Sequence, residues 1–312
     1  MKTHVRIGTR GSQLALWQAN YIKSRIEQAF SRVTVEITII KTTGDRITDR
    51  PLAAVGGKGL FVKEIETALM EKRIDLAVHS MKDMPGELPS GLTIGAVPER
   101  ENPFDVLISK EGRNLADYPK GARIGTSSLR RGSQLKHARP DLDILSIRGN
   151  LDTRIKKLKA GDYDAIVLAA AGLRRLGQEA EITEYLSETT MVPAVGQGAL
   201  CIETRENDEE MAPIMDALDH GPTRVCVEGE RAFLKQIEGS CHIPVACFGR
   251  IEDDGNVLLT AVVASEDGKE VIKETITSPA DTIEAKGREL AKLLLENGGK
   301  RILENLNSDD SQ

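Results

Sequence analysis

The apolar residues of the chain fall into short segments that alternate with helical patterns. Strand-like segments, bounded by polar or glycine-rich stretches, are expected at residues 2–8, 33–40, 74–78, 92–97, 106–108, 142–147 and 165–171. Between several of these, apolar residues recur at helical spacing, which predicts helices such as 14–26 and 60–70. Ser12 precedes the first helix and is a candidate for its N-terminal cap. This alternation predicts an α/β fold with doubly wound sheets.

The last third of the chain has a different pattern. A helix is expected over 223–237, and three strands follow at 244–251, 257–264 and 270–277, before a closing helix from Asp281 to about Asn297. The turns Asp-Asp-Gly-Asn and Glu-Asp-Gly-Lys between the strands are typical of hairpins. This part is predicted to be a small α+β domain with a three-stranded antiparallel sheet.

Two segments indicate where the chain crosses between lobes. Residues 98–103 are polar and bounded by prolines, and residues 191–198 are rich in proline and glycine. The pentapeptide Arg-Gly-Ser-Gln-Leu of residues 10–14 recurs at 131–135, which is a weak repeat but agrees with two similar α/β lobes. The predicted domains are a first α/β lobe of residues 1–99 with 198–218, a second α/β lobe of residues 100–197, and an α+β domain of residues 219–312.

Composition indicates a soluble globular protein. The 312 residues are 40% hydrophobic and 29% charged, and the length allows two or three domains. The apolar segments are too short to span a bilayer, and the first residues lack the apolar core of a signal peptide. We therefore expect a cytoplasmic protein without a membrane partner.

Charge is distributed unevenly along the chain. The net charge of −6 combines 15 basic and 12 acidic residues in 1–104, the same numbers in 105–193, and 12 basic and 24 acidic residues in 194–312. The acidic last third disfavours nucleic acid as a partner, whereas the mildly basic remainder suits small anionic ligands. Ordinary surface decoration would explain the same counts.

The four cysteines show no metal-binding or disulfide pattern. Cys241 follows two small residues and precedes an Ile-Pro step, which places its thiol on an accessible loop between helix and sheet. Cys201, Cys226 and Cys247 lie in apolar segments, and we interpret them as buried.

Asp83 follows the strand segment 74–78 at its carboxyl end, together with Lys82. In open α/β sheets ligands bind at this edge. A lone aspartate there would more simply be a solvated turn residue, so its significance depends on the residues that accompany it.

Several arginines also follow strand ends or open helices. If the sheets are doubly wound, these arginines collect at one edge, face a cleft between the lobes, and can bind carboxylates through their guanidinium forks. A single such residue would more often form a surface ion pair. The set consists of Arg10, Arg130, Arg131, Arg148, Arg154 and Arg175.

Four motifs together resemble the porphobilinogen deaminase family. They are His-Ser-Met-Lys-Asp-Met-Pro at 79–85, Gly-Thr-Ser-Ser-Leu-Arg-Arg at 125–131, Val-Gly-Gln-Gly-Ala at 195–199, and Glu-Arg at 230–231 with Gly-Ser-Cys at 239–241. The resemblance extends in order from Arg6 to about Leu295. It implies two lobes like those of solute-binding proteins and a third domain that carries the cysteine.

The resemblance implies a transferase that joins four porphobilinogen molecules head to tail, with loss of ammonia, into hydroxymethylbilane. Its cofactor is a dipyrromethane that the enzyme makes from its own substrate and holds by a thioether, here on Cys241. The implied catalytic residue is Asp83, which would stabilise cationic intermediates, and no metal is implied. The family also suggests a monomer.

Further site residues come from the same resemblance. Those implied to bind the cofactor are Lys82, Thr126, Ser128, Arg130, Arg131 and Arg148. Those implied to bind the substrate are Arg10, Ser12, Gln18, Lys58, Arg148, Arg154 and Arg175. The segment 42–58, which lacks a regular pattern, is either a disordered connection or a lid, and we favour a lid. Ala54 stands where many members have a second lysine, so Lys58 is expected to act alone.

A two-lobed solute-binding or ligand-sensing module without catalysis is the alternative. Similar lobes serve both functions, so the fold alone does not separate them. The mass that a covalent dipyrromethane adds to the chain would separate the two functions, because a binding module carries no dipyrromethane.

Overall fold

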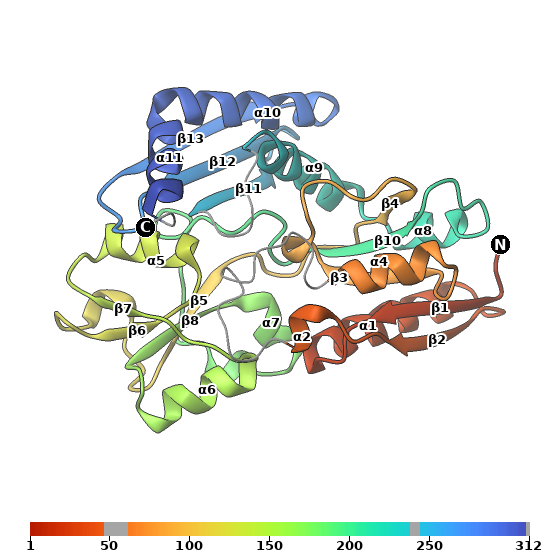
Figure 1. The fold of residues 1–312 in the computed structure, drawn as a ribbon, viewed down its shortest axis with the longest axis horizontal. Helices are drawn as coiled ribbons and strands as arrows, with labels where there is room; N and C mark the ends of the chain where they lie inside the picture. The colour runs from red at the N-terminus through yellow and green to blue at the C-terminus, as the bar shows by residue number, and fades with distance from the viewer. Residues whose placement is uncertain (47–61, 238–243, 310–312) are drawn as a thin grey trace. The chain divides into compact units, whose positions relative to one another are not determined.

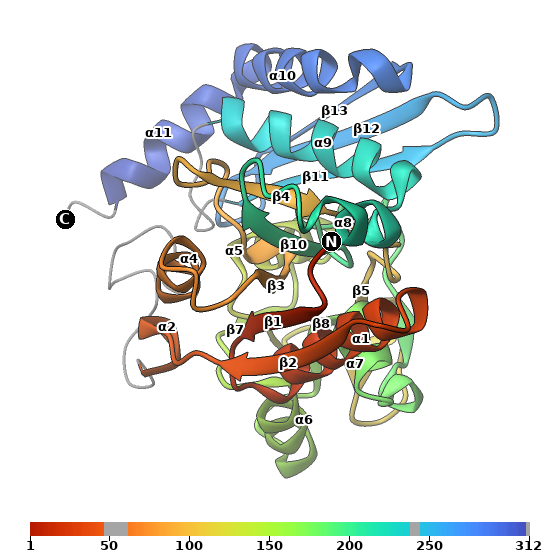
Figure 2. The same cartoon turned by 90° about the vertical axis from the view of Figure 1, so that its right-hand side faces the viewer.

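The computed structural model describes residues 1–46, 62–237 and 244–309, and the chain divides into two units. Unit 1 comprises residues 1–101 and 199–225, and unit 2 comprises residues 102–198 and 226–312. The described residues form three β-sheets, one in unit 1 and two in unit 2 (Figures 1 and 2).

The sheet of unit 1 has the strand order β2-β1-β3-β10-β4. Its strands are β1 (His4–Thr9), β2 (Thr34–Ile39), β3 (Leu76–Ser80), β4 (Leu92–Ala96) and β10 (Leu200–Arg205). Strand β1 is parallel to β2 and β3, whereas β10 is antiparallel to β3 and β4. The sheet is therefore mixed rather than wholly parallel, because the returning strand β10 enters between β3 and β4.

Helices cover both faces of this sheet. Helix α1 (Gln13–Ala29) and helix α8 (Ala212–Leu218) bury their apolar side chains in one cluster with the strands, and α4 (Lys63–Met70) packs on the other face through a second cluster. A short helix, α2 (Thr43–Arg46), follows β2. The expected N-terminal cap is confirmed, because the Ser12 hydroxyl accepts a hydrogen bond from the Ala15 amide.

The first sheet of unit 2 repeats this arrangement, with the order β7-β6-β8-β5-β9. Its strands are β5 (Asp105–Ser109), β6 (Arg123–Gly125), β7 (Asp143–Leu145), β8 (Ala165–Ala169) and β9 (Glu184–Tyr185). Strand β6 is parallel to β7 and β8, and β5 is antiparallel to β8 and β9. Helix α5 (Leu129–Ala138) contributes to the core on one face, and α6 (Leu151–Ala160) and α7 (Ala170–Arg175) contribute on the other. Helices on both faces of both sheets confirm the doubly wound α/β class.

The two mixed sheets share an arginine–aspartate contact that sequence reasoning did not predict. In unit 1, Asp75 directly precedes β3 and accepts hydrogen bonds from the backbone amide, Nε and Nη2 of Arg6. In unit 2, Asp164 directly precedes β8 and accepts from the same three groups of Arg123. In each case the contact joins the start of the central strand to the neighbouring parallel strand.

The C-terminal part of unit 2 contains the predicted antiparallel sheet, formed by β11 (Val245–Ile251), β12 (Val257–Ala264) and β13 (Val271–Ser278). Helix α9 (Gly221–Gln236) precedes it, and α10 (Ile283–Leu294) packs on β12 and β13. The predicted closing helix, from Asp281 to about Asn297, corresponds to α10 and the π-helical turn Leu295–Gly299 that directly follows it. Gly298 in that turn adopts a left-handed φ of 113°, and α11 (Lys300–Asp309) follows.

Two expectations from the sequence need correction. A strand was expected over the apolar segment 165–171, but β8 ends at Ala169 and Ala170 begins α7. The pentapeptide repeat is also not in structural register. Its first copy contains the cap of α1, whereas its second copy lies inside α5, which Ser128 caps instead.

Candidate functional site

Asp83 lies at the end of a single 3₁₀ turn, Met81–Asp83, that directly follows β3. The turn buries Met81 and Met84, each 1% exposed, and leaves Asp83 exposed. The Met81 amide donates to the Ala199 carbonyl, and the Met84 amide donates to the Met81 carbonyl. Within the described part of the chain, no hydrogen bond or ion pair involves the Asp83 carboxylate, so its charge is available to a ligand.

The strand behind this turn is fixed by buried polar contacts. Gln18, 2% exposed on α1, donates from Nε2 to the hydroxyl of Ser80 at 2.9 Å. One residue earlier on β3, Nε2 of His79 lies 2.9 Å from Oε2 of Glu203 on β10. These contacts hold the last residues of β3 on both sides, and Asp83 follows directly from them.

Glu66 on α4 belongs to the same buried group. Burial raises its pKa, and the neighbouring charge of Glu203 adds to this, while His79 acts in the opposite direction. Oε1 of Glu66 and Oε1 of Glu203 are buried without a hydrogen-bond partner among the described residues. Unit 1 therefore buries two carboxyl groups and one imidazole next to the strand that leads to Asp83.

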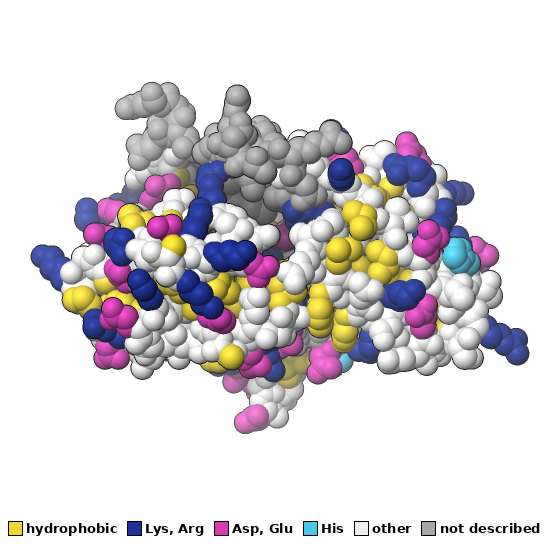
Figure 3. All heavy atoms as spheres, turned by 90° about the horizontal axis from the view of Figure 1, so that it is seen from below, with side chains coloured by type: hydrophobic (Ala, Val, Ile, Leu, Met, Phe, Trp, Pro, Cys, Tyr) yellow, Lys and Arg dark blue, Asp and Glu magenta, His cyan; other side chains and the backbone are white. Residues whose placement is uncertain are grey.

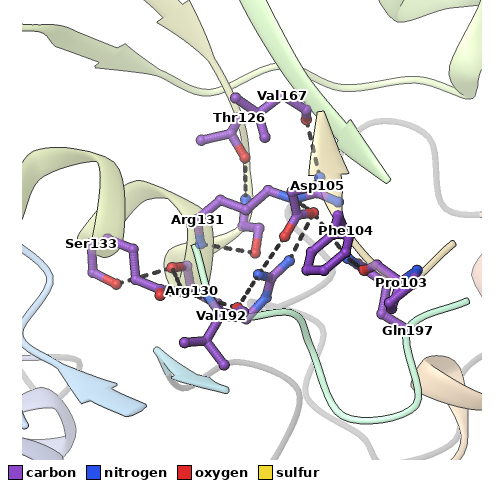
Figure 4. A network of polar contacts seen from close by, with 12 residues as sticks. Pro103, Phe104, Asp105, Thr126, Arg130, Arg131, Ser133, Val167, Val192 and Gln197 are labelled. Atoms are coloured by element: carbon purple, nitrogen blue, oxygen red, sulfur yellow. Dashed lines mark hydrogen bonds and ion pairs between the residues drawn. The ribbon is translucent and has the colours of Figure 1, made fainter. Parts of the chain in front are cut away.

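Unit 2 buries two arginines where helix α5 begins, after strand β6 (Figure 4). Arg130 and Arg131 lie in the first turn of α5 and are 6% and 7% exposed. Both contact Asp105, which is fully buried at the start of β5: Nη1 and Nη2 of Arg130 lie 2.7 and 3.2 Å from its oxygens, and Nε of Arg131 lies 2.8 Å from Oδ1. The forks that we expected to face a ligand are thus largely engaged within unit 2.

Each guanidinium retains N–H groups that the contacts with Asp105 do not use. Arg130 Nη1 also donates to the Val192 carbonyl at 2.8 Å, and Arg131 Nη1 donates to the Val167 carbonyl at 3.1 Å. In the described chain neither Nε of Arg130 nor Nη2 of Arg131 has an acceptor. Burial lowers the pKa of Arg131, Asp105 opposes this and Arg130 adds to it, yet arginine remains cationic at neutral pH.

Thr126 and Ser128 shape the loop before these arginines. Thr126 is 5% exposed, and its hydroxyl accepts from the Ser128 amide at 3.2 Å. The Ser128 hydroxyl in turn accepts from the Arg131 amide and caps α5. Two of the implied cofactor-binding residues therefore also determine where helix α5 begins.

The remaining predicted arginines have different surroundings. Arg148 is exposed, Arg154 donates from Nε to the Gly149 carbonyl at 2.8 Å, and Arg175 is 7% exposed and donates to the Gly198 carbonyl at 2.7 Å. Burial, together with the charge of Arg131, lowers the pKa of Arg154 to about 10. Arg131 thus lies within electrostatic reach of both Arg130 and Arg154. Arg10 and Lys82 are half-buried in unit 1, and Ser12 is exposed.

Cys241 and Lys58 lie outside the described residues, as does most of segment 42–58. The other cysteines, Cys201, Cys226 and Cys247, are buried free thiols, as the sequence predicted. The described ranges contain no group of three His, Cys, Asp or Glu side chains that could hold a metal ion.

The surface in Figure 3 shows basic and acidic side chains interspersed, with apolar atoms between them. None of the helices in residues 1–46, 62–237 and 244–309 is both long enough and apolar enough to cross a membrane.

Sequence reasoning missed Asp105, Glu203 and Glu66. Asp105 stands next to the crossover segment 98–103, and an acid that opens an apolar strand was a usable signal for a buried partner of the arginines. Nothing local marks Glu66, because it occupies an ordinary helical position.

The chain matches two family models. Residues 5–213 match "Porphobilinogen deaminase, dipyromethane cofactor binding domain", and residues 224–296 match "Porphobilinogen deaminase, C-terminal domain". A porphobilinogen deaminase of Geotalea uraniireducens is 52% identical over 96% of this chain and 93% of its own length. One from Nitratidesulfovibrio vulgaris is 52% identical over 96% of each chain.

Among solved structures, a probable amino-acid ABC transporter extracellular-binding protein of Bacillus subtilis has a TM-score of 0.42 at 12% identity, over 70% of this chain and 91% of that chain. This likeness is too low to support any conclusion. The two family models and the relatives that match nearly the whole sequence show that the chain belongs to the porphobilinogen deaminase family.

Proposed function

We propose how the reaction of this family is divided among the residues of this chain. The reaction joins four porphobilinogen molecules head to tail, releases ammonia, and yields hydroxymethylbilane on a covalent dipyrromethane primer. In our proposal Asp83 of unit 1 is the catalytic carboxylate, and the arginines of unit 2 bind the carboxylate side chains of the cofactor and the growing chain.

The exposed Asp83 carboxylate carries this proposal. It has no partner among the described residues, while the turn around it is anchored by two buried methionines. Such a charge is held in place and can stabilise the cationic intermediates of the reaction. Gln18 supports the same turn through Ser80, which suggests a structural contribution besides its proposed contact with substrate.

The proposal assigns the cofactor carboxylates to Lys82, Thr126, Ser128, Arg130, Arg131 and Arg148. It assigns the substrate to Arg10, Ser12, Gln18, Lys58, Arg148, Arg154 and Arg175. Burial and electrostatic coupling support Arg130, Arg131 and Arg154 most strongly, because buried cations of like sign attract anionic groups.

Cys241 is the proposed attachment site of the dipyrromethane. Its support is the burial of Cys201, Cys226 and Cys247, since a thiol that forms a thioether with a ligand must be reached by it.

Intact mass of the purified chain tests this assignment. Cys241→Ser should fold but show no dipyrromethane mass increment and no ammonia release, whereas Cys226→Ser should show both. A Cys241→Ser chain that still carries the increment would place the attachment elsewhere.

We further propose three domains, as expected from the sequence, and a cytoplasmic monomer that binds porphobilinogen and no nucleic acid. The three sheets support the domain division, and the acidic last third of the chain supports the absence of nucleic acid. Light scattering of the purified protein tests the monomer, which a dimer mass would contradict.

A further inference from the structure

Two guanidinium groups share one buried carboxylate in unit 2. Arg130 and Arg131 are adjacent in the sequence, both are less than a tenth exposed, and both contact Asp105, whose side chain has no exposed surface. Two cations this close and this dry repel each other, and a carboxylate between them offsets that repulsion. The three side chains therefore form a single electrostatic unit with net positive charge.

Asp105 is itself held in place. The Gln197 amide donates from Nε2 to Asp105 Oδ1 at 3.1 Å and to the Pro103 carbonyl at 2.7 Å (Figure 4). Pro103 and Gln197 lie within two residues of the points where the segment 102–198 of unit 2 begins and ends. The carboxylate thus has a defined position before any ligand arrives.

This arrangement limits what each arginine can offer. Asp105 takes the terminal fork of Arg130 and the Nε of Arg131, and backbone carbonyls take Nη1 of both. Of its five N–H groups, Arg130 retains that of Nε and one on Nη2, and Arg131 retains two on Nη2 and one on Nη1, so a ligand carboxylate is limited to these donors.

We propose that Asp105 is a positioning residue for cofactor assembly, which sets Arg130 and Arg131 so that their remaining donors bind the carboxylates of the dipyrromethane. This inference rests on the proposed function of the two arginines. Free arginine side chains would have to be ordered when the ligand binds, and Asp105 orders them beforehand, which reduces the entropy cost of binding. Asp105 acts through the arginines and need not contact the ligand.

Two substitutions of Asp105 test the proposal. Asp105→Asn removes the charge, while Asp105→Glu keeps the charge and moves the carboxylate by about one carbon–carbon bond, roughly 1.5 Å. The measurements are the thermal unfolding midpoint and the rate at which cofactor-free full-length chain gains the dipyrromethane mass on incubation with porphobilinogen. We expect both variants to gain it at least about tenfold more slowly, because a displacement of about 1 Å in a binding site can cost up to a hundredfold.

Asp164→Glu is the matched control. Asp164 also accepts two guanidinium bonds and lies in the same sheet, but it precedes β8 at the opposite edge. The variant Asp164→Glu should change the thermal unfolding midpoint without slowing cofactor assembly. If Asp105→Asn does not fold, Asp105→Glu decides the question, since it preserves the charge balance. Assembly at the wild-type rate in folded Asp105→Glu would overturn the proposal.

Arg131→Leu separates the proposed positioning role of Asp105 from the proposed binding role of the two arginines, on which it rests. If Arg131→Leu assembles the cofactor normally, the proposed role of the arginines fails. If Arg131→Leu is slow and Asp105→Glu is not, only the positioning role fails. The triple variant Asp105→Glu/Arg130→Leu/Arg131→Leu should be no slower than the double variant Arg130→Leu/Arg131→Leu, because Asp105 acts through those side chains. Further slowing would contradict the proposal by showing an independent effect.

Discussion

In both units an aspartate directly before the central strand accepts hydrogen bonds from the backbone amide, Nε and Nη2 of one arginine. The side chains at the opposite edges of the two sheets differ between the units. Arg6–Asp75 in unit 1 and Arg123–Asp164 in unit 2 use the same atoms. At the other edge, unit 1 presents Asp83. Similar scaffolds thus share their structural contacts at the amino ends of the central strands and differ at the carboxyl ends, where ligands bind.

The buried charges differ in the same way. Strand β10 of unit 1 and strand β5 of unit 2 occupy equivalent positions in their sheets, and each carries a fully buried carboxylate, Glu203 and Asp105. Glu203 contacts His79 and lies near Glu66, whereas Asp105 contacts two arginines. In our proposal unit 1 carries the catalytic carboxylate Asp83, and unit 2 binds the anionic side chains of the tetrapyrrole.

Arg131→Leu tests the part of this comparison that concerns unit 2. Loss of a charged hydrogen bond in a dry site costs about 1.5–3 kcal/mol, so cofactor assembly should slow by about tenfold or more. Intact mass during incubation with porphobilinogen measures it. Arg25 on α1, which contacts only Tyr21 among the described residues, supplies the control. An equal loss in Arg25→Leu would show that the predicted arginine set has no special role.

The shared contacts should matter for stability and not for catalysis. Burial opposes ionisation of Asp75, but hydrogen bonds from Arg6 and Lys2 outweigh it and lower its pKa to about 2. Because the folded pKa lies below the unfolded value, its stabilising contribution is present above about pH 4 and is lost as the pH falls toward 2.

Asp75→Asn should therefore lower the free energy of unfolding at pH 7 by about 1–2 kcal/mol, after allowance for solvent around Lys2 and Arg6. Asp164→Asn should cost less, because Asp164 and Arg123 are both more than a third exposed. Denaturant unfolding at pH 7 compares the two. A larger loss in Asp164→Asn would refute the ranking by burial.

A substitution of Glu66 is expected to raise the free energy of unfolding, in contrast to the loss expected for Asp75→Asn, and by a smaller amount. Its folded pKa is raised, so the unfolding free energy of the wild type should fall as the pH rises from about 4.5 through the folded pKa. Glu66→Gln removes this titration and should gain stability relative to wild type between pH 5 and pH 8. Glu71→Gln, an exposed change at the end of α4, should show no such trend. A pH-independent difference for Glu66→Gln would mean that burial and the charge of Glu203 do not favour the neutral form of Glu66.

The sequence predicted most elements because their apolar patterns are regular. Strand β12 matches its predicted bounds, and the cap at Ser12 is confirmed. The end of β8 could not be predicted, because Ala170 and Ala171 are buried in a helix that continues the apolar segment without interruption. Strand β9 is too short for a period to show.

The site was predicted less completely than the fold. Family motifs marked Asp83 and the arginines, but the contact of Asp105 with Arg130 and Arg131 joins residues about 25 positions apart and is seen only in the folded chain. The atoms of a guanidinium that remain available to a ligand depend on such tertiary contacts. Residue types along the chain therefore indicated that arginines bind carboxylates, but not through which nitrogen.

Asp83→Asn tests the account most directly, because it changes the charge at the carboxyl edge of unit 1 while leaving the arginines of unit 2 intact. The measurement is ammonia release in a single turnover, on protein shown by mass to carry the dipyrromethane. An ion pair at about 4 Å with an effective dielectric near 20 is worth roughly 4 kcal/mol. After partial compensation by water and dipoles, we expect release to slow by at least about a hundredfold, with normal unfolding. Release within a few fold of wild type would contradict the assignment of catalysis to unit 1.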